Sequence, residues 1–115
     1  MDDYIIKRFE NPDEVREFDK GKYEVVNLPH MTIGKATYHK GWKWSDDVKP
    51  TVGTESCQAT HLGVIVEGSV KAIHNDGTEA TYHAGDAYSI QPGHDGMVVG
   101  DTPAIVYEFA GAWGE

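Results

Sequence analysis

The sequence predicts an all-β fold, an antiparallel barrel or jelly roll, and three observations lead to this prediction. About eight short segments rich in β-branched and aromatic residues follow one another along the chain. Groups of glycine, proline, asparagine and aspartate that favour turns separate these segments. A helical pattern occurs only once, near the N-terminus. With 115 residues, the chain is long enough for one domain with a single hydrophobic core.

The single helical pattern begins at Asn11, a residue type that caps helices. A proline and two acidic residues follow it, as is typical of a first helical turn. We therefore expect a short helix that runs towards Phe18 and is ended by Gly21. On this basis residues 1–22 form an N-terminal extension with a short helix, and residues 23–115 form the β-barrel.

Turn signals divide the rest of the chain into the expected strands. Asn75, Asp76 and Gly77 form a strong hairpin signal, because such residues tolerate the positive φ that tight turns need. The polar segment 45–54 contains a proline and is expected to be a loop. The expected strands are residues 23–28, residues 31–40, a long strand from Glu55 through residue 73 around Gly68, strands on both sides of residues 75–77, a strand ending at Ile90, residues 97–99 and residues 104–109.

Charge and composition exclude several classes of partner. The chain has 19 acidic and 10 basic residues, for a net charge of -9, which repels nucleic-acid phosphates and anionic lipid surfaces. It has no apolar stretch near the roughly 20 residues of a membrane span, and its first residues do not resemble a secretion signal. We therefore expect a cytoplasmic protein that binds neither nucleic acid nor membrane. The single cysteine, Cys57, cannot form an internal disulfide, so it is either a packing residue or a chemically used thiol.

Three possible metal ligands lie close together before the apolar run 62–66. Glu55 and Cys57 are two residues apart and His61 follows four residues later, so an unbroken strand would place all three on one face. Carboxylate, thiolate and imidazole together suit a transition metal better than magnesium or calcium. The alternatives are a solvated Glu55, a Cys57 that packs in the core and a hydrogen-bonded His61.

The chain resembles the cupins, whose first motif is Gly, His-x-His, x3, Glu, x6, Gly. With the last glycine of this motif on Gly68, the two histidine positions fall on Glu55 and Cys57, and the glutamate position falls on His61. The spacing is kept while each ligand type is changed. The resemblance therefore implies a small single-domain cupin, a double-stranded β-helix, with altered metal-ligand motifs.

The second cupin motif is Gly, x5, Pro-x-Gly, x2, His, and it matches in part. Gly85 and Gly93 fall on its two glycines, Pro92 lies one place later than the motif's proline, and the histidine position falls on Gly96. His94 lies two residues earlier with the same strand parity and can take over the ligand role. Together the motifs imply a divalent transition metal, zinc, iron, nickel, copper or manganese, held by Glu55, Cys57, His61 and His94.

A further group of residues is expected to line a pocket inside the barrel. Aromatic walls with a few polar groups are typical of small-molecule sites. Asp95 can orient His94 through a carboxylate hydrogen bond or can cap the turn before it. For each of the other expected pocket residues, the alternative is that the side chain simply packs in the core. The expected pocket residues are Tyr38, Trp42, Trp44, Tyr88, Asp95 and Met97.

Two functions follow from the residues and the resemblance. The first is a metal-dependent enzyme acting on a small organic molecule, and the second is a non-catalytic or regulatory cupin that binds a small ligand without metal. A structural barrel with no ligand is a third possibility. The sequence does not decide whether the chain is an enzyme. The resemblance also implies a homodimer, formed through a strand edge or a sheet face.

Overall fold

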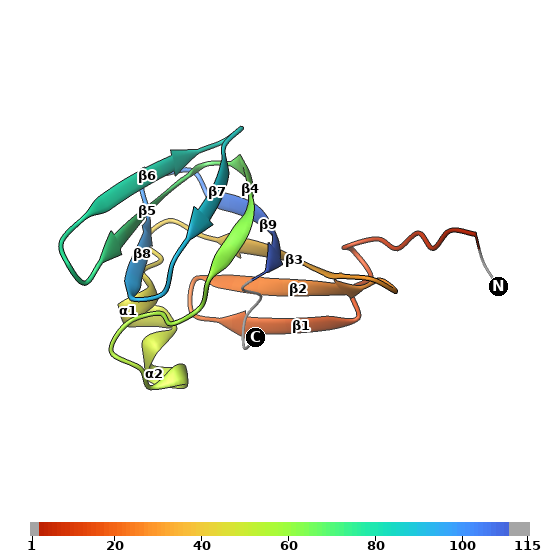
Figure 1. Cartoon of the computed structure of the whole chain (residues 1–115), viewed down its shortest axis with the longest axis horizontal. Helices are drawn as coiled ribbons and strands as arrows, with labels where there is room; N and C mark the ends of the chain where they lie inside the picture. The colour runs from red at the N-terminus through yellow and green to blue at the C-terminus, as the bar shows by residue number, and fades with distance from the viewer. Residues whose placement is uncertain (1–2, 111–115) are drawn as a thin grey trace.

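The computed structural model describes residues 3–110, and these residues form two antiparallel sheets that fold into a barrel (Figure 1). The last five residues of the expected barrel segment 23–115 lie outside the described part. Two short helices, α1 (Trp44–Asp47) and α2 (Lys49–Val52), lie below one end of the barrel in Figure 1. The strands are β1 (Glu14–Phe18), β2 (Gly21–Asn27), β3 (Thr32–Tyr38), β4 (His61–Glu67), β5 (Ser69–His74), β6 (Glu79–His83), β7 (Ala87–Ile90), β8 (His94–Val98) and β9 (Ala104–Ala110).

The strand order is that of an antiparallel β-barrel with crossovers between its two sheets. The larger sheet has the order β1-β2-β3-β9-β4-β7, and the smaller has the order β6-β5-β8. Strand β9 is central, because it pairs with β3 on one side and with β4 on the other. The predicted all-β fold, an antiparallel jelly roll, is confirmed.

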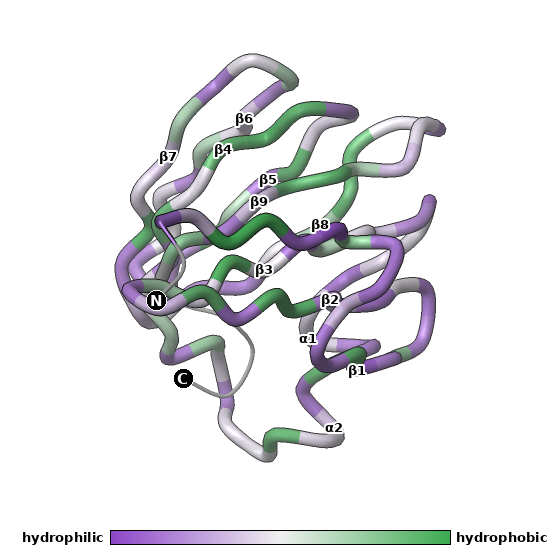
Figure 2. The backbone as a smooth tube through the Cα atoms, turned by 90° about the vertical axis from the view of Figure 1, so that its right-hand side faces the viewer, coloured by the Kyte–Doolittle hydropathy of each residue, from purple (hydrophilic) through white to green (hydrophobic). Residues whose placement is uncertain are grey.

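The hydrophobic core lies between the two sheets. Alternate residues of β9, such as Ala104 and Val106, are buried, and β4 contributes Ile65 at 1% exposure. This period of two is what the pleat of a half-buried strand requires. In Figure 2 the hydrophobic stretches fall mainly within strands, whereas loops and turns are mostly hydrophilic.

The predicted N-terminal helix is wrong, because residues 14–18 form strand β1. This strand pairs with β2 along its whole length, from Glu14 opposite Val25 to Phe18 opposite Gly21. Asp13 does not cap a helix: its carboxylate accepts a hydrogen bond from the backbone N–H of Asn27 at 2.7 Å. Cross-strand pairing therefore overrides the local capping signal, and the N-terminal extension adds a strand to the larger sheet. In Figure 1 the segment before β1 extends away from the barrel.

The predicted loop at residues 45–54 is also wrong in part, since α1 and α2 occupy most of it. Asp47 stabilises the start of α1, where its carboxylate accepts a hydrogen bond from the backbone N–H of Lys43 at 2.8 Å. Helix α2 has a proline in its first turn and ends at Gly53, which has a φ of 78°. Local capping thus gives two turns of helix where composition alone indicates a loop.

The predicted long strand from residue 55 to residue 73 is divided in the structure. Gly68 has a φ of 75° and turns the chain between β4 and β5. Strand β4 begins only at His61, so residues 55–60 are outside regular strands except for one isolated bridge between Cys57 and His94. Glu55 and Cys57 therefore do not follow the alternation of a strand.

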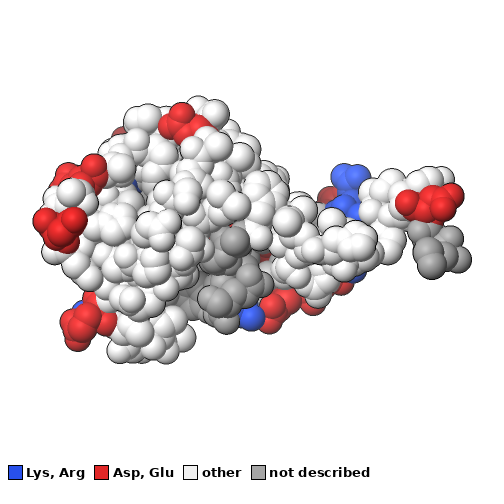
Figure 3. All heavy atoms as spheres, in the orientation of Figure 1, with Lys and Arg blue, Asp and Glu red and all other residues white. Residues whose placement is uncertain are grey.

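In Figure 3 acidic side chains form a few separate groups near the margins of the barrel, and few basic side chains are visible there. This distribution agrees with the net charge of -9. Among the described residues, neither four-residue helix is long and apolar enough to cross a membrane.

Candidate metal centre

Three side chains from two distant segments of the chain meet inside the barrel. Cys57 precedes β4, His61 begins β4 and His94 begins β8. Their possible ligand atoms, one sulfur and two ring nitrogens, all lie within 4.8 Å of one another. The distance from Cys57 Sγ to His61 Nε2 is 3.5 Å. This arrangement brings together three of the four residues predicted as metal ligands.

The backbone around Cys57 is held firmly against β8. The N–H of Cys57 donates to the carbonyl of His94 at 2.7 Å, and the N–H of Gly93 donates to the carbonyl of Cys57 at 2.7 Å. These two bonds join the loop directly to the strand that carries the third candidate ligand. The separation between Cys57 and His94 is therefore set by backbone pairing.

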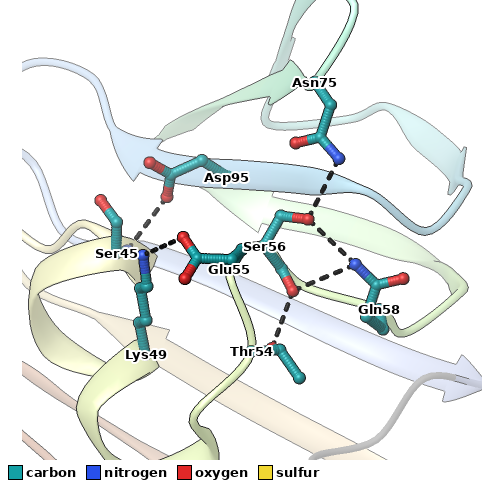
Figure 4. Close-up of polar contacts among 8 residues, drawn as sticks. All are labelled: Ser45, Lys49, Thr54, Glu55, Ser56, Gln58, Asn75 and Asp95. Atoms are coloured by element: carbon teal, nitrogen blue, oxygen red, sulfur yellow. Dashed lines mark hydrogen bonds and ion pairs between the residues drawn. The ribbon is translucent and has the colours of Figure 1, made fainter.

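Ser56 anchors the same loop from the other side (Figure 4). Its hydroxyl oxygen accepts hydrogen bonds from the side-chain amides of Gln58 at 2.9 Å and Asn75 at 3.2 Å. Its carbonyl accepts a further bond from Thr54 Oγ1 at 2.8 Å. Ser56 is buried, so this network satisfies polar groups that would otherwise be costly to bury. A loop without regular structure is thus given a defined position.

Glu108 orients His61 from β9. Its carboxylate oxygens lie 3.1 and 3.0 Å from His61 Nδ1, and the hydroxyl of Tyr88 donates to it at 2.9 Å. Glu108 is only 3% exposed, so these bonds satisfy a buried carboxylate. With Nδ1–H donated to Glu108, the Nε2 lone pair of neutral His61 is left for a metal.

Glu108 is not among the predicted site residues, although the sequence carries one signal for it. Within β9, Ala104, Val106 and Glu108 share one parity, and the first two are apolar. A carboxylate on the inward face of a strand needs a buried partner. That alternation was the available sign of a functional group.

His94 is oriented by the backbone. Its Nδ1 lies 2.7 Å from the carbonyl oxygen of Gln91, to which it donates, so its Nε2 carries the lone pair. The ring of His94 lies edge-on to that of His61, with 5.0 Å between centroids. In their neutral forms both imidazoles therefore leave Nε2 for a metal.

The thiol and the imidazole of this group perturb each other. Burial by itself raises the pKa of Cys57, but hydrogen bonding, first of all to His61, outweighs it and lowers the pKa to about 6. Burial by itself lowers the pKa of His61, but hydrogen bonds to Cys57 and Glu108 raise it to about 10. Without a metal, the favoured state at neutral pH is thus a Cys57 thiolate beside a His61 imidazolium.

Glu55 does not join the group, which corrects its predicted position. Its side chain is 97% exposed, and its carboxylate forms an ion pair with Lys49 at 3.1 Å (Figure 4). The irregular backbone at residues 55–60 breaks the parity that would have placed Glu55 beside Cys57. Within the described residues, the carboxylate next to the site comes instead from Glu108.

Two of the predicted pocket residues, Asp95 and Met97, do not line the cavity. They occupy the less buried positions of β8, whereas His94, Gly96 and Val98 are buried. Asp95 accepts a hydrogen bond from the backbone N–H of Ser45 at 3.0 Å and so ties α1 to the barrel (Figure 4). The backbone, rather than Asp95, orients His94.

A cavity of about 270 Å³ extends from the Cys57, His61 and His94 group. The other four predicted pocket residues line it, and two of them form a ring pair: Tyr38 and Trp42 have centroids 4.1 Å apart. Tyr82 and Tyr88 form a second pair at 4.5 Å. Burial and the nearby negative charge of Glu108 raise the pKa of Tyr88 and Tyr82, so both phenols stay protonated. The predicted pocket residues that lie along this cavity are Tyr38, Trp42, Trp44 and Tyr88.

The donor set fits a divalent transition metal. One thiolate and two imidazoles are soft and borderline ligands, which suit zinc, iron, nickel or copper and do not suit magnesium or calcium. Three protein ligands leave at least one coordination position for water or substrate, as in catalytic zinc sites. The open side of the group faces the aromatic cavity, since all three residues line it.

Replacing Glu108 by glutamine is expected to lower the pKa of His61. The change keeps the size of the side chain but removes the negative charge that favours the imidazolium. It should also weaken metal binding by about 10- to 100-fold, the usual effect of losing a carboxylate that supports a ligand histidine. The His61 ring can be titrated by NMR in metal-free protein. Glu79→Gln, which removes an exposed partner of Lys71, is the control, and an unchanged His61 titration in Glu108→Gln would contradict the assignment.

Comparison with known proteins gives a fold but no close relative. No protein-family model matches the chain, and no curated protein matches it. Solved structures do match. An RmlC-like cupin from Shewanella frigidimarina aligns at a TM-score of 0.62 and 19% identity, over 94% of this chain and 91% of that one. A double-stranded β-helix protein from Klebsiella pneumoniae aligns at 0.62 and 16% identity, over 97% and 88%.

Part of a larger enzyme has the same fold. Oxalate decarboxylase from Lactobacillus farciminis, solved as a formate complex, aligns at a TM-score of 0.60 and 18% identity. The alignment covers 86% of this chain, which spans about a third (31%) of the length of the decarboxylase. These likenesses confirm the double-stranded β-helix that the sequence motifs implied.

Proposed function

We propose that this chain, a small protein with the cupin fold, holds one divalent transition metal ion on Cys57, His61 and His94 and presents it to a small organic molecule in the barrel. The observation that carries the proposal is the meeting of three ligand atoms within 4.8 Å at the inner end of a cavity. Glu108 and the Gln91 carbonyl support it, because they hold the two imidazoles in the metal-binding tautomer.

The proposed chemistry is that of a metal-dependent enzyme. A bound metal would polarise a carbonyl or activate water or dioxygen at its open position. The chain's own groups would supply the rest: Glu108 orients His61, and the aromatic rings restrict water in the cavity. Tyr88, protonated and hydrogen-bonded to Glu108, keeps that carboxylate in place.

A non-catalytic ligand-binding cupin is the second candidate. The aromatic cavity supports it independently of any metal, because such walls bind small molecules by burial and ring contacts. The altered ligand set, in which Cys57 and His61 replace the histidine and the glutamate of the first cupin motif, also favours it over a typical cupin enzyme.

Metal content separates these candidates. Protein purified without an affinity tag, analysed by elemental mass spectrometry, is expected to contain a transition metal in near-stoichiometric amount. If the protein contains no metal, and still binds none of zinc, iron, nickel, copper or manganese under reducing conditions, the metal proposal is rejected and the ligand-binding candidate takes its place. The reducing step matters, since a free thiol must remain a thiolate to bind metal. The same requirement fits a reducing compartment, and we propose a cytoplasmic location.

Zinc binding at neutral pH is expected to release about one proton. Cys57 is already ionised there, because its pKa is lowered to about 6, whereas His61 must lose the proton that its raised pKa retains. Below about pH 6 the thiol also becomes protonated, so zinc affinity should fall more steeply with further acidification. Calorimetric titration in two buffers of different ionisation enthalpy measures the release. Equal heats in both buffers would contradict the thiolate–imidazolium state.

We also propose a homodimer that forms through the outer face of the larger sheet. Strands β4 and β9 pair with Val64 opposite Tyr107, and their outward residues are apolar. Leu62 is 49% exposed, and Val66 is 50% exposed. Apolar residues exposed side by side on a sheet are typical of a protein interface.

Leu62→Glu is expected to convert this dimer to a monomer, because a two-fold interface would bring two carboxylates together in an apolar contact. Sedimentation equilibrium measures the mass. Val15→Glu is the control, since Val15 is equally exposed, at 48%, but lies on β1 at the far edge of the sheet. A monomeric wild type, or a dimer unaffected by Leu62→Glu, would contradict the proposal.

A further inference from the structure

The cavity at the candidate metal centre is small. Its volume of about 270 Å³ is slightly below the roughly 300–1,000 Å³ of typical small-molecule sites. An occupant must therefore be compact, of the size of one substituted ring.

The walls of the cavity are suited to a planar ring. Tyr38 and Trp42 form one ring pair, and Tyr82 and Tyr88 form another, with interplanar angles of 31° and 30°. The four rings belong to three different strands and one loop, so they surround the space rather than stack along one element. Aromatic contacts of this kind contribute about 0.5–1.5 kcal/mol beyond the burial of apolar area.

The charges around the cavity exclude an anionic occupant. No lysine or arginine lines it among the described residues. The nearest cationic group, His61, is already paired with Glu108 at 3.0 Å through Nδ1 and faces Cys57 through Nε2. The nearby lysines have partners elsewhere: the ammonium of Lys49 pairs with Glu55 and that of Lys20 with Asp47.

Adding a metal does not make the cavity cationic. A divalent ion brings two positive charges, and the Cys57 thiolate and the buried Glu108 carboxylate bring two negative ones. With neutral imidazoles the loaded group is therefore close to electrically neutral. A ligand carboxylate on the open coordination position would therefore leave the buried group with a net negative charge, which is costly away from water.

We infer that the cavity takes a compact, uncharged, planar aromatic molecule with one oxygen or nitrogen that faces the Cys57, His61 and His94 group. This inference names the ligand class for the proposed function and rests on it for the role of the metal. Small dianions, including the oxalate on which one structural neighbour acts, fall outside the class.

Three probes of similar size test the inference: acetophenone, benzoate and cyclohexyl methyl ketone. Acetophenone is planar and neutral, benzoate is planar and anionic, and cyclohexyl methyl ketone is neutral but neither planar nor aromatic. Their affinities are measured by calorimetry and by ligand-observed NMR, in metal-free and in zinc-loaded protein at neutral pH. We expect acetophenone to bind at least about tenfold tighter than benzoate. It should bind about two- to tenfold tighter than the saturated ketone.

Tyr82→Leu and Tyr38→Leu each remove one ring from a different pair. Each variant is expected to bring the ratio of the affinities for acetophenone and the saturated ketone towards one. The ratio of the affinities for acetophenone and benzoate should remain unchanged. Circular dichroism shows whether each variant folds. If one variant does not fold, the other still tests the inference. Tyr107→Leu is the matched control, because Tyr107 lies on the outer face of β9 against Phe9, with ring centroids 5.2 Å apart.

The outcomes separate the ligand class from the metal proposal. Three results would overturn the inferred ligand class in a protein that binds zinc, and each leaves the metal site standing. They are benzoate binding as tightly as acetophenone, the saturated ketone binding as tightly as acetophenone, and no probe binding at millimolar concentration. A protein that binds no metal but keeps both affinity ratios overturns the proposed metal function and retains the ligand class. Metal binding together with both expected affinity ratios supports the ligand class and the metal function.

Discussion

Replacing Cys57 by serine and His94 by alanine together is expected to abolish metal binding and leave the barrel folded. The double variant removes two of the three candidate ligands, so the loss should exceed the about 10- to 100-fold cost of removing a supporting group. His61 is deliberately kept. Its removal would leave the Glu108 carboxylate buried without its charged partner, at a cost of about 3–5 kcal/mol.

The measurement is metal stoichiometry by elemental mass spectrometry, with zinc affinity measured by competition against a chelator. Glu55→Gln is the matched control, because Glu55 was predicted as a ligand but lies exposed beside Lys49. This variant should bind metal like the wild type. Metal retained by the double variant, or lost from Glu55→Gln, would contradict the site as assembled here.

Gly68→Ala is expected to destabilise the fold by about 3 kcal/mol. Gly68 has a φ of 75°, a conformation that costs other residues about 1–3 kcal/mol. A Cβ here would also clash with the backbone: it would lie 2.8 Å from Ala104 Cα and closer still to the carbonyl oxygen of Pro103. Backbone atoms at the start of the central strand β9 cannot move aside easily, so strain adds to the conformational cost.

Urea unfolding of wild type and variant measures this loss. Gly77→Ala provides the matched control, because Gly77 has a similar φ of 91° but no atom within 4 Å of the added Cβ. The control should lose only the conformational part, about 1–2 kcal/mol. Equal losses at the two positions would show that the close approach between Gly68 and Pro103 carries no cost.

Local patterns explain where the sequence analysis succeeded. The strands near residues 23–28, 31–40 and 104–109 were predicted from their β-branched and aromatic residues and, at residues 31–40, from alternation. The turn at residues 75–77 was found because Asp-Gly pairs tolerate positive φ, and Gly77 has a φ of 91°.

Long-range contacts explain where it failed. The helix expected near residues 11–18 had a good local capping signal, yet β1 gains a full ladder of cross-strand bonds with β2. The strand expected from Glu55 had the right spacing, yet backbone bonds between Cys57 and His94 hold that segment as a loop. In both places pairing with a distant segment outweighed local preference.

The sequence by itself determined the all-β class, most of the turns and the residues Cys57, His61 and His94 as candidate ligands. These features depend on residue type, parity and spacing over a few positions. Only the tertiary structure decided that Glu108 orients His61 across 47 residues of chain, that Glu55 points to solvent, and that four aromatic rings enclose a space. The physical reason is that strand register and loop path are set by hydrogen bonds and packing between distant segments, and no short stretch of sequence records which segments those are.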